Sequence, residues 1–349
     1  MRMKAVFVWM FALLATVASP QTALSVHAQA VTSFDPPGSK ETIPYSINPA
    51  GEVAGYYTDT AGHTHGFVRD TGGAISTFDP PGSTETIALS INPAGEVTGY
   101  YTDTARNTHG FVRDAQGTIV TFGPPGSAYT QVFSINPAGQ VTGVYATAEF
   151  VTHGFIRDAR GAFTIFDVPG STYTQPSSIN PRGEVTGYYV DGAETVHGFV
   201  RDARGAITAF DVPGAIQTVP LSINPAGQIS GYYTDAAFAT LSFVRDAEGT
   251  ITTFEVPGAR QTMPFSINPA GEVTGASIDA AFAPHGFVRD SEGAITTFDV
   301  PGALVTVPLS INPAGQVTGL YLDAAFATHG FVRAGSNVVE TATGFSLAW

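Results

Sequence analysis

Residues 46–56 read Ser-Ile-Asn-Pro-Ala-Gly-Glu-Val-Ala-Gly-Tyr, and the Ser-Ile-Asn-Pro part of this stretch occurs seven times in the chain. Its copies begin at Ser46, Ser90, Ser134, Ser178, Ser222, Ser266 and Ser310, always 44 residues apart. A Phe-Val-Arg or Phe-Ile-Arg segment keeps the same spacing from Phe67 to Phe331. Such a period is typical of a chain built from copies of one small structural unit. The sequence therefore predicts seven equivalent units with no insertion between them.

Turn residues divide each copy of the repeat. Asn48-Pro49-Ala50-Gly51 places Pro where its fixed φ is needed and Gly last, which suits a type I turn followed by a left-handed Gly. The segment from Asp70 to Gly73 follows the same logic, and Pro81-Gly82 matches the centre of a type II turn. The intervening segments are rich in Val, Ile, Thr, Tyr and Phe, which favour strands. Each copy is therefore expected to form four short strands.

Four strands per unit and seven units of 44 residues favour an all-β fold, a seven-bladed β-propeller. An open β-solenoid is the alternative, although its rungs usually repeat at shorter periods and its ends need atypical caps. Val31-Thr32-Ser33-Phe34 resembles the fourth strand of a unit but stands before the first complete one, whereas the pattern decays after Arg333. We therefore expect residues 31–35 to close the last blade and residues 335–349 to form a tail outside the ring.

Residues 1–30 have the features of a secretory signal peptide. Met1-Arg2-Met3-Lys4 is basic, Ala5 to Ala18 is apolar, and Ala28-Gln29-Ala30 is a small-x-small cleavage site. The apolar run is shorter than the roughly 20 residues that a transmembrane helix needs; an uncleaved anchor is the alternative. We expect cleavage near Ala30, a secreted protein (periplasmic or extracellular), and a single propeller domain over residues 31–349.

Composition excludes several classes of partner. The net charge is −14, and loss of the two basic residues of the signal would take it to −16 (−14 − 2). Nucleic acid and anionic lipid are poor partners for such an acidic chain. The chain has no cysteine, so no disulfide framework supports the fold. We expect a monomer with no nucleic-acid partner and no membrane insertion after signal cleavage.

Residues 91–101 read Ile-Asn-Pro-Ala-Gly-Glu-Val-Thr-Gly-Tyr-Tyr and residues 108–113 read Thr-His-Gly-Phe-Val-Arg. Together they resemble the bacterial extracellular HAF-type repeat family, named for a His-Ala-Phe tripeptide, whose members carry Ile-Asn-x-x-Gly-x-Val-x-Gly before that tripeptide. Here Gly replaces the middle Ala of the tripeptide in six of seven copies, a departure from the name-giving motif. The resemblance covers essentially the whole mature chain. It implies an exported repeat protein and carries over no catalytic residue.

Several polar residues recur at the repeat spacing. The histidines are His65, His109, His153, His197, His285 and His329; the arginines are Arg69, Arg113, Arg157, Arg201, Arg245, Arg289 and Arg333; the aspartates are Asp59, Asp103, Asp191, Asp235, Asp279 and Asp323. Metal ligands must converge at one place, and a Ser-His-Asp triad needs one set in one cleft. We interpret the repeated sets as architecture, with histidine hydrogen bonds inside each blade and arginine–carboxylate pairs or turn caps. We expect no metal, no cofactor and no catalytic residue.

Function is expected where the repeat varies, because loops on a rigid scaffold select ligands. The connection after the second strand of each unit varies most. It carries Phe150, Phe238, Phe282 and Phe326. The connections between blades, expected on the same face, carry Tyr129 and Tyr173. We interpret this aromatic, acidic face as a binding site for a carbohydrate or a protein; packing of each Phe over its own blade is the alternative.

The sequence thus favours a secreted, non-enzymatic binding propeller, because no single-copy acid–base or nucleophile constellation is present. A propeller hydrolase or lyase acting on an exported polymer is one alternative. A surface protein that assembles through its apolar loops is another. The asymmetric polar residues available to an enzyme are His63, Arg106, Arg182 and Arg260, which belong to different copies.

Overall fold

The computed structural model describes residues 30–335, and their regular structure consists of 28 β-strands. The first copy of the repeat forms β2 (Ser39–Ile47), β3 (Val53–Asp59), β4 (Thr64–Arg69) and β5 (Ile75–Phe78), paired antiparallel in that order. Within the described residues no helix is long and apolar enough to cross a membrane. The predicted all-β fold is confirmed.

The following copies repeat this order of strands. They comprise β6 (Ser83–Ile91), β7 (Val97–Asp103), β8 (Thr108–Arg113) and β9 (Ile119–Phe122); β10 (Tyr129–Ile135), β11 (Val141–Ala146), β12 (Thr152–Arg157) and β13 (Phe163–Phe166); β14 (Ser171–Ile179), β15 (Val185–Asp191), β16 (Val196–Arg201) and β17 (Ile207–Phe210); β18 (Ala215–Ile223), β19 (Ile229–Asp235), β20 (Thr240–Arg245) and β21 (Ile251–Phe254); β22 (Gln261–Ile267), β23 (Val273–Ile278), β24 (Pro284–Arg289) and β25 (Ile295–Phe298).

The last group of strands combines both ends of the described chain. β26 (Val305–Ile311), β27 (Val317–Leu322) and β28 (Thr328–Arg333) are joined by β1 (Val31–Phe34), which pairs antiparallel with β28. The register sets Val31 opposite Arg333 and Phe34 opposite Gly330. The N-terminal strand therefore occupies the place that β5 occupies in the first copy, and it covers an edge of β28 that would otherwise be free.

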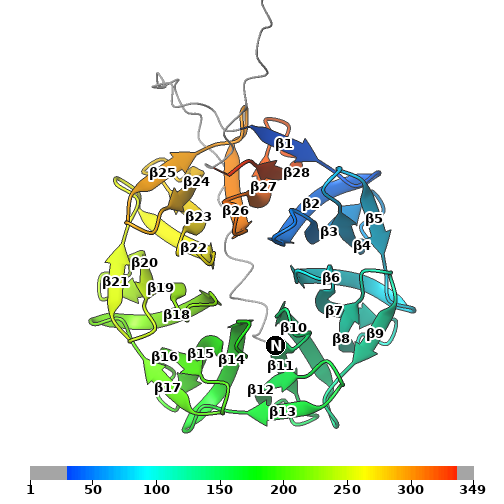
Figure 1. The fold of residues 1–349 in the computed structure, drawn as a ribbon, viewed down its shortest axis with the longest axis vertical. Helices are drawn as coiled ribbons and strands as arrows, with labels where there is room; N and C mark the ends of the chain where they lie inside the picture. Colours follow the sequence, from blue (N-terminus) through cyan, green and yellow to red (C-terminus); the bar gives the residue numbers. More distant parts are fainter. Residues whose placement is uncertain (1–29, 336–349) are drawn as a thin grey trace, which may run out of the picture.

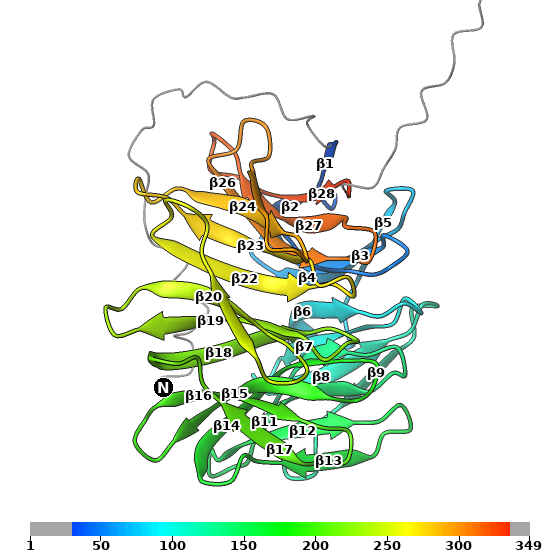
Figure 2. The same cartoon turned by 60° about the vertical axis from the view of Figure 1, so that its left-hand side comes forward.

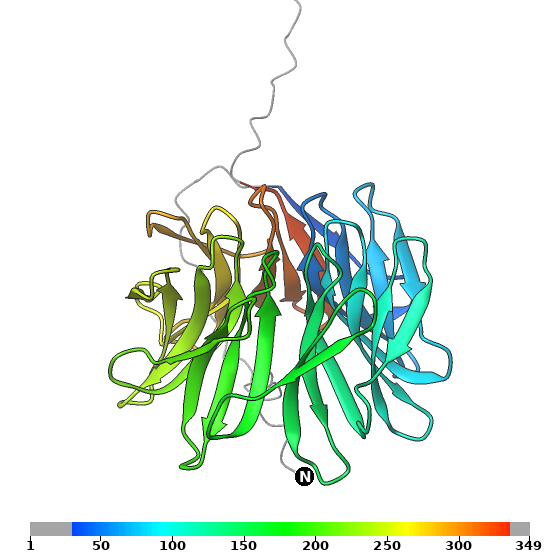
Figure 3. The same cartoon turned by 60° about the horizontal axis from the view of Figure 1, so that its bottom comes forward.

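The strand groups, called units below, are arranged in a ring (Figure 1), with the first strand of each unit nearest the centre and the fourth at the periphery. Neighbouring units such as β14–β17 and β18–β21 lie side by side (Figure 2), and a parallel pairing of Val196 with Gln217 joins them. Loops gather at two opposite faces of the ring (Figure 3).

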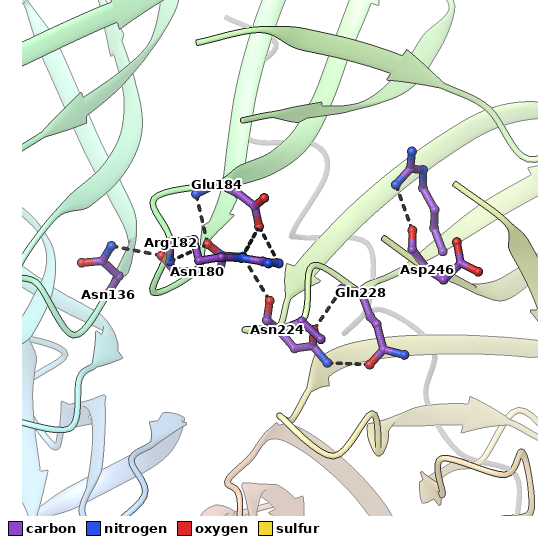
Figure 4. A network of polar contacts seen from close by, with 9 residues as sticks. Asn136, Asn180, Arg182, Glu184, Asn224, Gln228 and Asp246 are labelled. Carbon is purple, nitrogen blue, oxygen red and sulfur yellow. Dashed lines mark hydrogen bonds and ion pairs between the residues drawn. The ribbon is translucent and has the colours of Figure 1, made fainter. Parts of the chain in front are cut away.

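Two sets of hydrogen bonds connect the units from copy to copy. Asn48 donates from Nδ2 to the carbonyl of Asn92 (3.2 Å), each later asparagine donates to the next, and Asn312 donates to the carbonyl of Asn48 (3.1 Å). Part of this asparagine circuit is drawn in Figure 4. The second set runs from isoleucine N–H groups to serine hydroxyls, as from Ile91 to Ser46 Oγ (3.3 Å). The asparagines are buried, so these bonds replace water that their amides have lost.

Each unit has its own apolar core. Phe67 and its copies are fully buried, and Ile47, Val53 and Tyr57 pack around Phe67. The Arg69 guanidinium lies 5.0 Å from the centroid of the Phe34 ring of the neighbouring unit, and the six other copies make the same contact. The guanidinium thus stacks on an aromatic face. Arg69 also donates to the carbonyl of Asp70, as a turn cap would. Of the two alternatives expected at these positions, an arginine–carboxylate pair or a turn cap, the described residues show the turn cap.

Candidate functional site: the loop face

One face of the ring is formed by the loops between the second and third strands of each unit, and we call it the loop face. In the first unit this loop comprises residues 60–63, between β3 and β4. The first strand of the following unit begins beside it, because Thr64 pairs with Glu85 at the start of β6. Loops and the starts of first strands therefore share one surface.

An aspartate holds most of these loops in shape. Asp59 Oδ1 accepts hydrogen bonds from the N–H groups of Ala61 (2.8 Å) and His63 (2.9 Å). The bond from the His63 N–H contributes most to lowering the pKa of Asp59 to about 2. Gly62 follows with φ of +89°, in the left-handed region that favours glycine. The loop thus needs one left-handed residue at a fixed place.

Four units carry phenylalanine at that left-handed position. These residues are Phe150 (φ +62°), Phe238 (φ +63°), Phe282 (φ +66°) and Phe326 (φ +62°). Their exposed fractions are 86%, 77%, 51% and 58%, in the same order. A left-handed conformation costs an L-residue about 1–2 kcal/mol. The rings of Phe150 and Phe238 are too exposed to recover much of this cost by packing on their own units. Such a placement is unfavourable for folding.

The loop face is not uniform around the ring. Phe238, Phe282 and Phe326 belong to three consecutive units, the fifth to the seventh. Ile216 and Leu304, at the starts of first strands on the same side, are also exposed. These five side chains are called the apolar arc. Sequence reasoning missed Leu304, although its signal was visible: its copies vary from Lys and Thr to Ile and Arg.

A small pocket lies within the apolar arc. The guanidinium carbon of Arg260 is 4.4 Å from the centroid of the Phe282 ring. These two residues, with Gln261 and Ile278, line a shallow pocket of about 170 Å³. Arg260 reaches this place because its N–H donates to the carbonyl of Ile278 (2.7 Å), which holds the residue against the end of β23. The pocket offers a guanidinium, an amide and an aromatic ring.

The two predicted tyrosines lie elsewhere than in loops. Tyr129 begins β10, Tyr173 lies within β14, and both are half-buried. Tyr173 and Tyr188 donate their hydroxyls to Gln175 Oε1. Burial raises the pKa of Tyr173 to about 12. Tyr129 and Tyr173 are less accessible than the phenylalanines and belong to first strands. The structure therefore separates the predicted site into exposed loop phenylalanines and half-buried strand tyrosines.

The recurring histidines each contact an aspartate. His285 Nδ1 lies 2.9 Å from Asp299, and His285 Nε2 lies 3.4 Å from Asp279. The hydrogen bond with Asp299 is the largest cause that raises the pKa of His285, and burial opposes it. In the last unit the partner of His329 is Asp35, directly after β1, at 2.7 Å. The expected hydrogen bonds of these histidines within their own units are confirmed.

Neither a metal site nor a serine–histidine pair is formed in the part of the chain that the structure describes. There, no group of three or more His, Asp or Glu side chains is placed to hold a metal ion. The serine hydroxyls accept from isoleucine N–H groups, and in residues 30–335 no hydrogen bond joins them to the histidines. His63 and Arg106 lie in loops of the loop face, whereas Arg182 lies in a turn on the opposite face and pairs with Glu184 (3.0 Å).

Comparisons with known proteins concern the fold alone. No family model and no curated protein sequence matches this chain. Virginiamycin B lyase from Staphylococcus aureus is similar in structure, with 15% identity, a TM-score of 0.57, and coverage of 87% of this chain and 99% of that one. The β-propeller domain of the Trilobed protease from Pyrococcus furiosus, described as an open velcro topology, has 10% identity, a TM-score of 0.61, and coverage of 84% and 95%.

A third similar structure is that of prolyl endopeptidases, with 12% identity, a TM-score of 0.65, and coverage of 89% of this chain and 50% of that one. At such identities the likeness shows the fold and no activity. This chain is a β-propeller. The predicted propeller architecture is confirmed at this level.

Proposed function

We propose that this propeller is an exported, non-enzymatic protein that binds a carbohydrate or protein ligand through the phenylalanines of the loop face. The observation that carries the proposal is the exposed phenylalanine at a left-handed position where the first copy has glycine, Gly62. Four such rings make the loops less stable than glycine would, and a bound ligand would cover their exposed surface.

The proposed architecture is a seven-bladed ring that forms one domain over residues 31–349. Support comes from the pairing of β1 with β28 and from the asparagine circuit, which returns from Asn312 to Asn48. The proposed export and the membership in the His-Ala-Phe repeat family rest on the sequence. The signal peptide, residues 1–30, and the tail, residues 335–349, lie almost wholly outside the described residues.

Binding is tested on the mature chain with glycan and peptide arrays. We expect the variant with Phe150, Phe238, Phe282 and Phe326 all replaced by Gly to lose at least about tenfold in affinity, since apolar contact area is removed. The control is Val120→Thr with Ile165→Thr, which removes exposed apolar side chains from the outer strands β9 and β13.

Three outcomes would overturn the proposal. Unchanged binding by the four-glycine variant would reject the loop face as the site. Cleavage of a polysaccharide by the purified protein, with no binding on the arrays, would favour the hydrolase or lyase. A monomer–oligomer equilibrium that the four-glycine variant abolishes would favour a self-assembling surface protein.

A further inference from the structure

We infer that the pocket formed by Arg260, Gln261, Ile278 and Phe282 binds a single carboxylate-bearing sugar residue of a glycan that is otherwise neutral, since the acidic chain would repel a polyanion. This inference rests on the proposed function and adds the chemical class of the ligand and the position of its charged residue. It uses residues that the repeat does not share.

The pocket results from two departures from the repeat that coincide in one unit. At the position of Arg260 the other copies carry Lys40, Thr84, Ala128, Thr172, Ile216 and Leu304. At the position of Phe282 they carry Gly62, Arg106, Phe150, Glu194, Phe238 and Phe326. Only the sixth copy combines a cation with a loop phenylalanine. Architecture shared by all units therefore does not account for the pair.

The Arg260 guanidinium is available to a ligand. In residues 30–335 the one ion pair between an arginine and a carboxylate is that of Arg182 with Glu184, so Arg260 has no such partner there. Stacking on Phe282 holds the planar group in place while its N–H groups stay at the edge. A carboxylate suits this fork, since its two oxygens accept two parallel hydrogen bonds.

Main-chain donors around the pocket are already used. The Phe282 N–H donates to the Asp279 carbonyl (3.1 Å), and Ala281 and Ala283 donate to Asp279 Oδ1 (2.8 Å each). A peptide added as a strand would need such groups free. Recognition must come from side chains, and the guanidinium, the Gln261 amide and the ring suit the carboxylate, a hydroxyl and the C–H face of a sugar.

The size of the pocket suits one residue of a chain ligand. Its volume of about 170 Å³ is below the roughly 300–1,000 Å³ of pockets that enclose a whole drug-sized ligand. Phe238 and Phe326, in the units on either side, are also exposed. Arg260 is the one basic side chain beside the phenylalanines of the apolar arc. It would therefore bind the acidic residue of the ligand.

The test uses an otherwise neutral oligosaccharide that carries one uronate residue and the same oligomer with its carboxyl group reduced to an alcohol, titrated into the mature protein by calorimetry. We expect the acidic oligomer to bind at least about tenfold more tightly, since a charge-assisted bidentate pair is lost on reduction. Arg260→Gln should remove this preference, so that the two oligomers bind the variant equally. Arg106→Gln, which removes the same charge elsewhere on the loop face, should preserve the preference.

Two results would overturn the inference. Equal binding of the two oligomers would show that the carboxylate is not recognised, and equal losses in the two arginine variants would show a response to net charge. If a neutral glycan or a peptide binds in a phenylalanine-dependent way, only the inference fails. If the four-glycine variant binds as the parent does, the proposed function fails with it.

Discussion

Gly55 lies at the closest approach between the first two strands of its unit. A Cβ atom at this residue would lie 2.1 Å from the carbonyl oxygen of Ile43 and 2.8 Å from the Cα of Pro44. These are backbone atoms, so they can give way only if the strands separate. All seven copies carry glycine here.

Gly55→Ala is therefore expected to lower the free energy of unfolding by more than about 2 kcal/mol. The matched control is Gly192→Ala, where a Cβ would meet nothing within 4 Å, and there we expect no loss. Urea unfolding of the two variants measures the difference. Equal stabilities would contradict the close approach of β2 and β3.

The loop phenylalanines give a prediction of opposite sign. Phe150→Gly should raise the free energy of unfolding by a few tenths to about 1 kcal/mol, because relief of the left-handed strain exceeds the entropy cost of glycine. Thermal unfolding compares the variant with the parent. A loss of stability beyond about 0.5 kcal/mol would show that the ring packs on its own unit after all.

Some of these residues stood out in the sequence, but the contacts that require them could not be predicted from it. Glycine in place of the family's alanine at Gly66 was evident as a departure, but its cause is a neighbouring ring: a Cβ would lie 2.6 Å from Phe78. The stacking of Arg69 on Phe34 could not be foreseen, because the two residues meet only when the first and last units are neighbours.

At the scale of elements, turn residues predicted the hairpins well. Gly51 donates to the carbonyl of Asn48 (3.0 Å) with φ of +93°, as the type I turn followed by a left-handed glycine requires. Turn residues recur at both ends of each strand, so their positions also predicted where the strands begin and end. The pocket at Arg260 was not predictable in this way, because it depends on the start of β22 lying beside the end of β23.

The histidine–aspartate contacts predict how stability depends on pH. The pKa of His285 is raised by Asp299 first, and those of His65, His197 and His329 are raised too. A raised pKa stabilises the fold fully below the unfolded value of about 6.5, and this contribution is lost as pH rises through the folded pKa. We expect a lower free energy of unfolding at pH 8 than at pH 6.

His285→Leu isolates one of these contributions, since the fifth copy has Leu241 at this position and tolerates it. The variant should lose less stability than the parent between pH 6 and pH 8. Urea unfolding across this range is the measurement. Identical losses would show that Asp299 and Asp279 do not favour the protonated imidazole.

At the scale of the whole molecule, the two ends of the described chain hold the ring together. Phe34 lies under Arg69, and Asp35 accepts hydrogen bonds from Thr42 (2.6 Å) and from His329. Asp35 thus contacts both the first and the last unit. These contacts join the first and last units of a chain that has no cysteine.

A disulfide across this seam should stabilise the protein. Thr32 and Val332 are opposite each other in the β1–β28 register, and Thr32→Cys with Val332→Cys should raise the free energy of unfolding by about 2–4 kcal/mol when oxidised. Val68→Cys with Ser76→Cys is the equivalent pair within the first unit, and it encloses a far shorter loop. It should stabilise less. Equal effects of the two cross-links on thermal unfolding would contradict closure at β1.

The asparagine circuit limits how the number of repeat copies in the gene can change. Tandem copies so similar exchange with one another during recombination, and such exchange adds or removes whole copies. Each asparagine needs only a neighbour, so six of the seven bonds would tolerate a changed copy number. The bond from Asn312 to Asn48 joins the first and last copies, as do the bond from the Ile47 N–H to Ser310 Oγ and the β1–β28 pairing, and all three form only at a number of copies that brings these copies together. Selection on copy number thus acts at the contacts between the first and last copies.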